Sequence, residues 1–115
     1  MIEKIMLDYL NDALTAPVYM ERPVNPPREY VIIQKTGSSK RNQICSSTLA
    51  FQSYSSSLYE AALLNEVVKN AVENAVTLPE ISSAKLNSDY NFTNTAAKQY
   101  RYQAVFDITH YQEAN

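Results

Sequence analysis

Residues 100–111 alternate between two kinds of side chain, and this pattern constrains the fold more than any other feature of the chain. The even positions are aromatic or apolar with a histidine at the end: Tyr100, Tyr102, Ala104, Phe106, Ile108 and His110. The odd positions are mostly polar: Arg101, Gln103, Val105, Asp107 and Thr109. A period of two is typical of a strand that buries one side and exposes the other. We therefore predict a sheet that ends with this strand.

Three further segments have the composition of strands. Tyr30–Thr36 contains three consecutive β-branched residues, Ile44–Tyr54 is long enough to need a twist or a bulge, and residues 84–92 alternate with one polar face. Val18–Met20 fits a short edge strand. A proline-rich stretch, residues 22–28, lies between Val18–Met20 and Tyr30–Thr36 and predicts an extended surface connector.

Two segments have helical spacing. Apolar residues recur every three or four positions from Ile2 to Leu14, and Pro17 then disfavours further helix. A second helix is expected after Ser57, which with Glu60 fits a capping box. Its predicted apolar stripe comprises Leu64, Val67, Val68, Ala71, Val72 and Ala75.

This order of elements predicts an α+β fold, with one mostly antiparallel sheet and both helices packed on one of its faces. A chain of 115 residues fits a single domain, residues 1–115, with one core. The residues expected in that core are Ile5, Leu10, Ile32, Phe51, Val68, Val72, Leu86 and Phe106.

The chain has one glycine, one cysteine and one histidine, against nine tyrosines. A single glycine excludes a glycine-rich phosphate loop, and one cysteine plus one histidine cannot supply a zinc site. The net charge of -2, with both signs interspersed, disfavours a dedicated nucleic-acid binder. The longest apolar stretch is too short to span a membrane, and no signal peptide is evident. We expect a soluble, intracellular protein without cofactor, metal or membrane partner.

No residue pattern predicts a catalytic site. Asp107 lies on the opposite face of its strand from His110, so the two do not form a catalytic pair. Cys45 has no activating base in its local sequence, and we interpret it as a small strand residue. The acids of the second helix, Glu60, Glu66 and Glu73, alternate with Lys69 as on a solvated face with local charge pairs. We expect a protein that is not an enzyme.

The tyrosines suggest a stacking platform for single-stranded nucleic acid. Against this, Tyr90, Tyr100 and Tyr102 share faces with Phe92, Phe106 and Ile108, which favours core or interface positions.

The segment between the predicted hairpin strands is the most distinctive charged feature. It comprises Gly37, Ser38, Ser39, Lys40, Arg41, Asn42 and Gln43. One interpretation is a soluble turn. The other is a protruding arm that contacts another chain or a polyanion, and the segment is our candidate protein interface.

Three stretches carry a resemblance to a known family: Tyr30–Gly37, Lys85–Thr93 and Tyr100–Ile108. They resemble the tail-completion and head–tail joining proteins of long-tailed bacteriophages and prophages of low-GC Gram-positive bacteria. The resemblance implies a tail-terminator domain that forms a ring, expected to be a hexamer, at the head-proximal end of the tail tube. It implies as partners other copies of the chain, the major tail tube protein and the head connector. The implied location is the virion, after synthesis in the host cytoplasm.

The resemblance implies no catalytic residue and no specific nucleic-acid contact. Three alternatives stay open from the sequence: a head-closure or other minor structural protein of a phage, a small nucleic-acid-binding module, and a small intracellular enzyme. A head-closure protein differs from a tail terminator in its partner, which sequence separates poorly.

Overall fold

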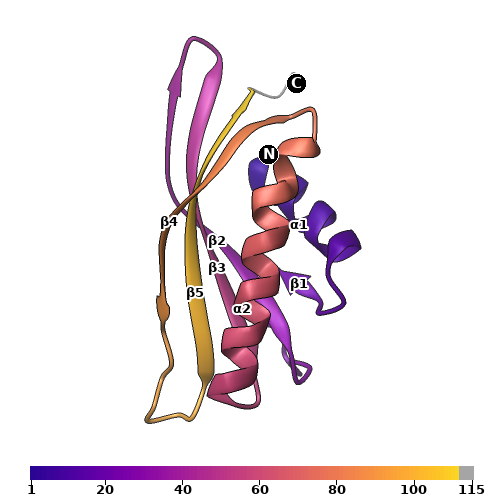
Figure 1. The fold of residues 1–115 in the computed structure, drawn as a ribbon, viewed down its shortest axis with the longest axis vertical. Coiled ribbons are helices and arrows are strands. Elements are labelled where there is room, and N and C mark those ends of the chain that lie inside the picture. The colour runs from indigo at the N-terminus through magenta and orange to yellow at the C-terminus, as the bar shows by residue number, and fades with distance from the viewer. Residues whose placement is uncertain (112–115) are drawn as a thin grey trace.

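A computed structural model describes residues 1–111 and has an α+β architecture, in which one five-stranded sheet is covered on one face by two helices (Figure 1). The elements are α1 (Ile2–Ala13), β1 (Val18–Tyr19), β2 (Tyr30–Arg41), β3 (Ile44–Ser55), α2 (Leu58–Glu73), the 3-10 helix η1 (Asn74–Thr77), β4 (Ile81–Asn91) and β5 (Tyr100–Tyr111). The strand order is β1-β2-β3-β5-β4, and only the β1–β2 pair is parallel. The predicted fold class is confirmed.

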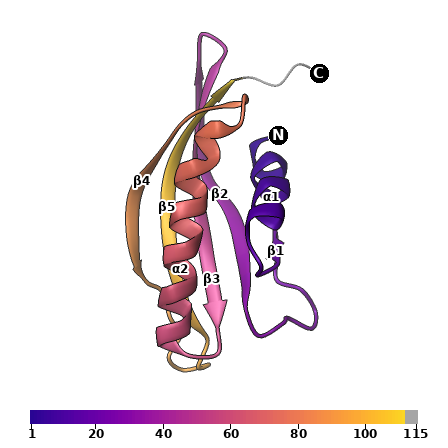
Figure 2. The ribbon, with the colours of Figure 1, turned by 45° about the vertical axis from the view of Figure 1, so that its right-hand side comes forward.

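The core lies between the sheet and the helices. Phe51 on β3 and Phe106 on β5 are fully buried and meet edge to face, with ring centroids 5.9 Å apart. Figure 2 shows α1 lying over β2 and α2 lying over β5. Buried side chains from both helices reach this layer: Ile2, Met6, Leu10, Leu64, Val68 and Val72. Tyr9 joins the helices by donating its hydroxyl to the Ala71 carbonyl at 2.7 Å, and burial raises its pKa.

Three expected core positions and one position of the predicted helical stripe differ from the prediction. Leu86 is 44% exposed, because β4 is the edge strand of the sheet. Ile5 is only partly buried. Ile32 is buried, but with Tyr30 and Tyr54 in a separate cluster on the opposite sheet face. Val67, predicted within the apolar stripe of α2, is 53% exposed, because the stripe is narrower than the spacing indicated.

The hairpin between β2 and β3 is longer than predicted. Strand β2 continues to Arg41, so that the turn consists of Asn42 and Gln43 alone, with φ of 52° and 65°. Two consecutive positive φ angles are typical of the tight hairpin turn that matches strand twist. The prediction that Gly37 belongs to the turn is wrong, since Gly37 pairs with Thr48 inside the ladder.

Helix α2 begins as predicted, with one difference. The Ser57 hydroxyl accepts a hydrogen bond from the Glu60 N–H at 3.1 Å, which is the first half of the capping box. The Glu60 carboxylate, however, accepts from Ser56 and from Arg28. Within residues 1–111, no helix is long and apolar enough to cross a membrane.

Candidate functional site

The outer half of the β2–β3 hairpin forms an arm that rises beyond the helices, and β5 stays paired with its β3 strand as far as Ile44 (Figure 1). All residues of β2 from Gln34 to Arg41 are exposed, although every position from Gly37 onwards is paired with β3. Strand β1 covers the outer edge of β2 only at Val31 and Ile32. Within the described residues, the arm therefore has a free outer edge on β2, whose side chains bury little surface, while its β3 strand is held by β5.

The charges of the arm point to different faces. Lys40 pairs with Cys45 and shares its helix-side face, whereas the next residue, Arg41, projects from the opposite face. Neither cation takes part in an ion pair with any residue that the structure describes. Both are thus available to a partner molecule.

A β-bulge at the base of the arm changes the alternation of β2. Lys35 pairs with Leu49 and Gly37 with Thr48, so Thr36 is an extra residue without a partner on β3. As a result Lys35 and Ser38, three positions apart, project from the same face. The sequence pattern does not reveal this, because the period of two predicts opposite faces.

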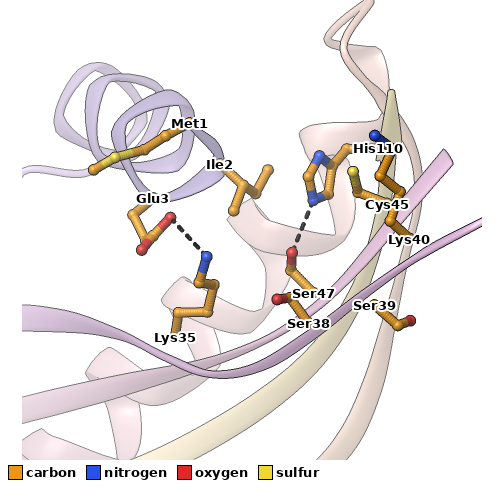
Figure 3. Close-up of a pocket in the computed structure, with 10 residues that line it drawn as sticks. All are labelled: Met1, Ile2, Glu3, Lys35, Ser38, Ser39, Lys40, Cys45, Ser47 and His110. Atoms are coloured by element: carbon orange, nitrogen blue, oxygen red, sulfur yellow. Dashed lines mark hydrogen bonds and ion pairs between the residues drawn. The ribbon is translucent and has the colours of Figure 1, made fainter. Parts of the chain in front are cut away.

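This shared face is the floor of a hollow of about 510 Å³ at the base of the arm (Figure 3). Strand β2 contributes Lys35, Ser38 and Lys40, and the first turn of α1 forms a wall that includes Glu3. Lys35 Nζ lies 3.8 Å from Glu3 Oε1, which is an ion pair too long for a hydrogen bond. Glu3 Oε1 is buried and accepts no hydrogen bond from the residues described.

Ser47 and His110 also line this hollow, and their side chains meet. Ser47 Oγ lies 2.8 Å from His110 Nε2. The alternation of one strand relates His110 only to residues of that strand, so the sequence did not predict this contact with Ser47 on β3. Cys45 is paired with His110 across the ladder. Since β3 bonds to both β2 and β5, the backbone N–H groups near Ser47 serve the sheet and cannot form an oxyanion hole.

The opposite face of the sheet is uncovered by helices and carries an aromatic cluster. Tyr30 and Tyr54 stack with centroids 4.5 Å apart, and both are buried. Burial raises the pKa of Tyr30, an effect that the nearby Arg22 opposes. The Arg101 guanidinium lies 4.4 Å from the Phe92 ring centroid and donates to the Tyr54 hydroxyl at 3.0 Å. Tyr30 and Tyr54 are buried, which leaves little surface of these two rings for stacking on bases.

A second row crosses the same face beside this cluster. Gln52 donates to Gln103 at 2.8 Å, and Gln103 donates to the Tyr90 hydroxyl. Tyr90 and Phe92 meet edge to face at 5.9 Å. Tyr100 and Tyr102 are half-buried on the helix side. The predicted placement of Tyr90 on one face with Phe92 and of the other two with Phe106 is confirmed.

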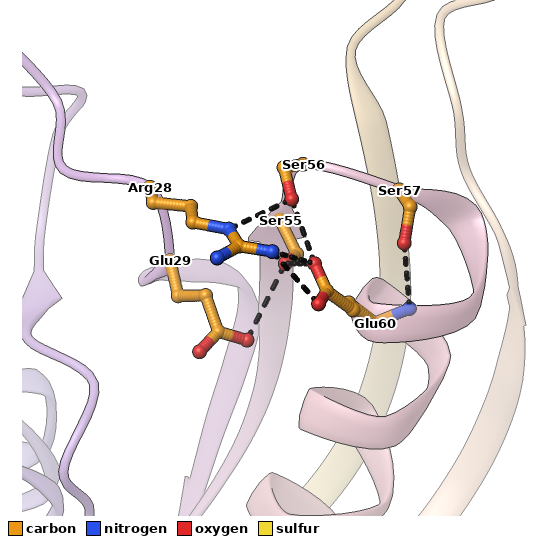
Figure 4. Close-up of polar contacts among 6 residues, drawn as sticks. All are labelled: Arg28, Glu29, Ser55, Ser56, Ser57 and Glu60. Atoms are coloured by element: carbon orange, nitrogen blue, oxygen red, sulfur yellow. Dashed lines mark hydrogen bonds and ion pairs between the residues drawn. The ribbon is translucent and has the colours of Figure 1, made fainter.

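The acids of α2 make structural contacts. Arg28 binds both Glu60 carboxylate oxygens at 2.8 Å and donates to Ser56 at 2.9 Å, which ties the proline-rich connector to the helix (Figure 4). Hydrogen bonds from Ser56 and then Arg28 lower the pKa of Glu60.

Lys69 pairs with Glu66 at 2.8 Å, as predicted, and also with Asp89 on β4. The hydrogen bond to Asp89, and then the one to Glu66, raise the pKa of Lys69. Glu73 is exposed. These contacts hold α2 to its neighbours.

Residues 1–111 contain no group of three or more His, Cys, Asp or Glu side chains placed to hold a metal ion. No protein-family model matches the chain, and no curated protein matches it either.

Proposed function

We propose that this protein is a structural subunit of a bacteriophage or prophage virion, of the tail-terminator type, and that it acts without catalysis. In this role copies of the chain form a ring that caps the tail tube and joins it to the head connector. The family resemblance described above supplies the biological setting. The ordered, projecting arm is the observation that carries the proposal.

An arm of this kind is costly unless it meets a partner. Ordering each residue has an entropic cost, and burial of apolar surface usually offsets it. From Gln34 to Arg41 the side chains of β2 are exposed, so the isolated chain gains little from ordering them. A preordered arm instead lowers the cost of association, because its conformation does not change on binding.

The exposed edge strands of the sheet also favour assembly. Strand β2 has a free edge beyond Ile32, and β4 is free along its whole outer side. Exposed strand edges pair readily with other chains unless bulges or charges protect them. The bulges in β4 after Ile81 and Leu86 protect that edge, whereas β2 has no bulge beyond Thr36. Contacts with a neighbour are therefore expected along the arm.

The test is reversal of charge at the arm tip, Lys40→Glu with Arg41→Glu. Exposed charges contribute little to stability, so the melting temperature should stay near the wild-type value. Like charge placed in an assembly contact should impair ring formation or capping. The assay is complementation of a phage that lacks this gene, with electron microscopy of tail lengths. Overlong or headless tails are the expected result.

A matched control reverses two cations away from the arm, Lys85→Glu with Lys98→Glu. Both lysines are exposed, and the total change in charge is the same. This control should give normal particles. Normal particles at normal titre from the arm variant would refute the role of the arm, and equal defects in both variants would point to net charge instead.

A further inference from the structure

The hollow beside the arm shares Lys40 with the proposed assembly contact, but it also contains groups that this role does not use. Its lining includes two ammonium groups, Lys35 and Lys40, and one carboxylate, Glu3, so these three groups carry an excess of one positive charge. We propose that it binds the phosphate group of a small hydroxylated ligand, such as a sugar phosphate or polyol phosphate.

The bulge at Thr36 is what assembles the phosphate end of the site. It places the side chains of Lys35, Ser38 and Lys40 on one face of β2, next to Ser47 and His110. Lys40 is in no ion pair within the part of the chain that the structure describes, so its ammonium is free to pair with an anion. Ser38 adds a hydroxyl donor to the same lining, next to Ser47 (Figure 3). Ammonium and hydroxyl donors together suit the three acceptor oxygens of a phosphate monoester.

Helix α1 contributes a second, independent feature. The helix has 12 residues and begins at Ile2. Its first turn, Met1 to Glu3, lines the hollow. The N-terminus of a helix carries partial positive charge, which favours an anion close to it. The helix field and the β2 lysines therefore favour an anion in the same space.

Glu3 determines what the rest of the ligand must be. Its Oε1 atom is buried and accepts no hydrogen bond from residues 1–111, and an unsatisfied buried acceptor is unfavourable. Figure 3 shows Glu3 beside Lys35, on the other side of the hollow from Lys40. A ligand with a phosphate at Lys40 and a hydroxyl at Glu3 satisfies both groups. The volume of about 510 Å³ exceeds the needs of a lone phosphate ion and falls within the range of small-molecule pockets.

The proposal is tested by isothermal titration calorimetry with three probes: inorganic phosphate, glycerol 3-phosphate and acetate. We expect saturable binding of both phosphates, with glycerol 3-phosphate the tighter. Lys40→Gln should weaken both by at least about tenfold, because it removes a charge-assisted contact. Glu3→Gln should reduce the preference for glycerol 3-phosphate, because an amide accepts the ligand hydroxyl less strongly than a carboxylate does.

The matched control is Arg41→Gln, which removes the neighbouring cation from the opposite face of the arm. It should bind both phosphates as the wild type does, and all variants should melt near the wild-type temperature. Equal losses in Arg41→Gln and Lys40→Gln would reduce the effect to general charge and overturn the site. Acetate binding as tightly as inorganic phosphate would overturn the choice of phosphate, and no saturable binding of any probe would overturn the proposal as a whole. None of these outcomes bears on phage complementation, so the assembly role is judged separately.

Discussion

Ser47 on β3 and His110 on β5 lie 63 residues apart in the chain, and yet Ser47 Oγ is 2.8 Å from His110 Nε2. Both residues are buried, and the other ring nitrogen of His110 lies 3.4 Å from the Tyr111 carbonyl. A serine hydroxyl beside an imidazole is one requirement of a serine hydrolase that uses a histidine base. The pair here lies inside a sheet whose N–H groups are already bonded, so we interpret it as a polar contact that fixes the top of β5.

If that interpretation holds, Ser47 is not a nucleophile. The hydrolysis rate of p-nitrophenyl acetate should be the same for the wild type and for Ser47→Ala. In the phage assay, His110→Gln with Cys45→Ser should leave particle formation largely intact, because glutamine can still bond to Ser47. A hydrolysis rate that drops at least about tenfold in Ser47→Ala would contradict a non-enzymatic protein.

Stability should depend on glycine in the hairpin turn but not at Gly37 in the β2 strand. Gln43 has φ of 65°, which glycine adopts without strain, so Gln43→Gly should raise the free energy of unfolding by about 1 kcal/mol. At Gly37 an added Cβ meets nothing within 4 Å. Gly37→Ala should therefore be neutral or stabilising by up to about 1 kcal/mol. Chemical denaturation measures both values. A clear loss of stability in Gly37→Ala would show that the fold requires glycine at position 37.

Two apolar residues paired across the β4–β5 ladder should contribute very different amounts to the free energy of unfolding. Phe106 is fully buried, so Phe106→Ala should cost about 3–5 kcal/mol. Its partner Leu86 is 44% exposed, and Leu86→Ala should cost less than about 1 kcal/mol. Urea unfolding of both variants checks this pair. Similar losses would mean that β4 is covered in solution by a contact that the single chain does not make.

Glu60 should make stability depend on pH. Its pKa is lower in the folded state than in the unfolded state, so its contacts stabilise the fold above the ordinary carboxyl range. This contribution should disappear as the pH falls through the lowered folded pKa. Glu60→Gln should therefore be less stable than the wild type near neutral pH and equally stable in acid. Unfolding curves over this pH range test the prediction.

Arg28→Gln provides the companion measurement. It removes the guanidinium that binds Glu60 but leaves the Ser56 hydrogen bond, so the pH-dependent difference should become smaller without vanishing. A pH-dependent difference unchanged by Arg28→Gln would assign the lowered pKa to Ser56 alone.

Local patterns in the sequence were sufficient for the element types and for one side of the core. Alternation predicted which face of β5 is buried, and helical spacing placed Leu10, Val68 and Val72 against the sheet, because burial repeats with the period of each element. The Ser57 cap was also predictable, since capping depends on residues three positions apart.

Tertiary structure decided whatever depends on neighbours far along the chain. Leu86 is exposed because β4 lies at the sheet edge, and Ile32 is buried away from the helices because tyrosines cover it from the other face. The contact between Ser47 and His110 requires β3 and β5 to be paired in one particular register. The hollow depends on one unpaired residue, Thr36, which breaks the alternation of β2 and turns Ser38 to the face of Lys35. A bulge changes the register with a partner strand, and a single strand's own sequence does not specify that register.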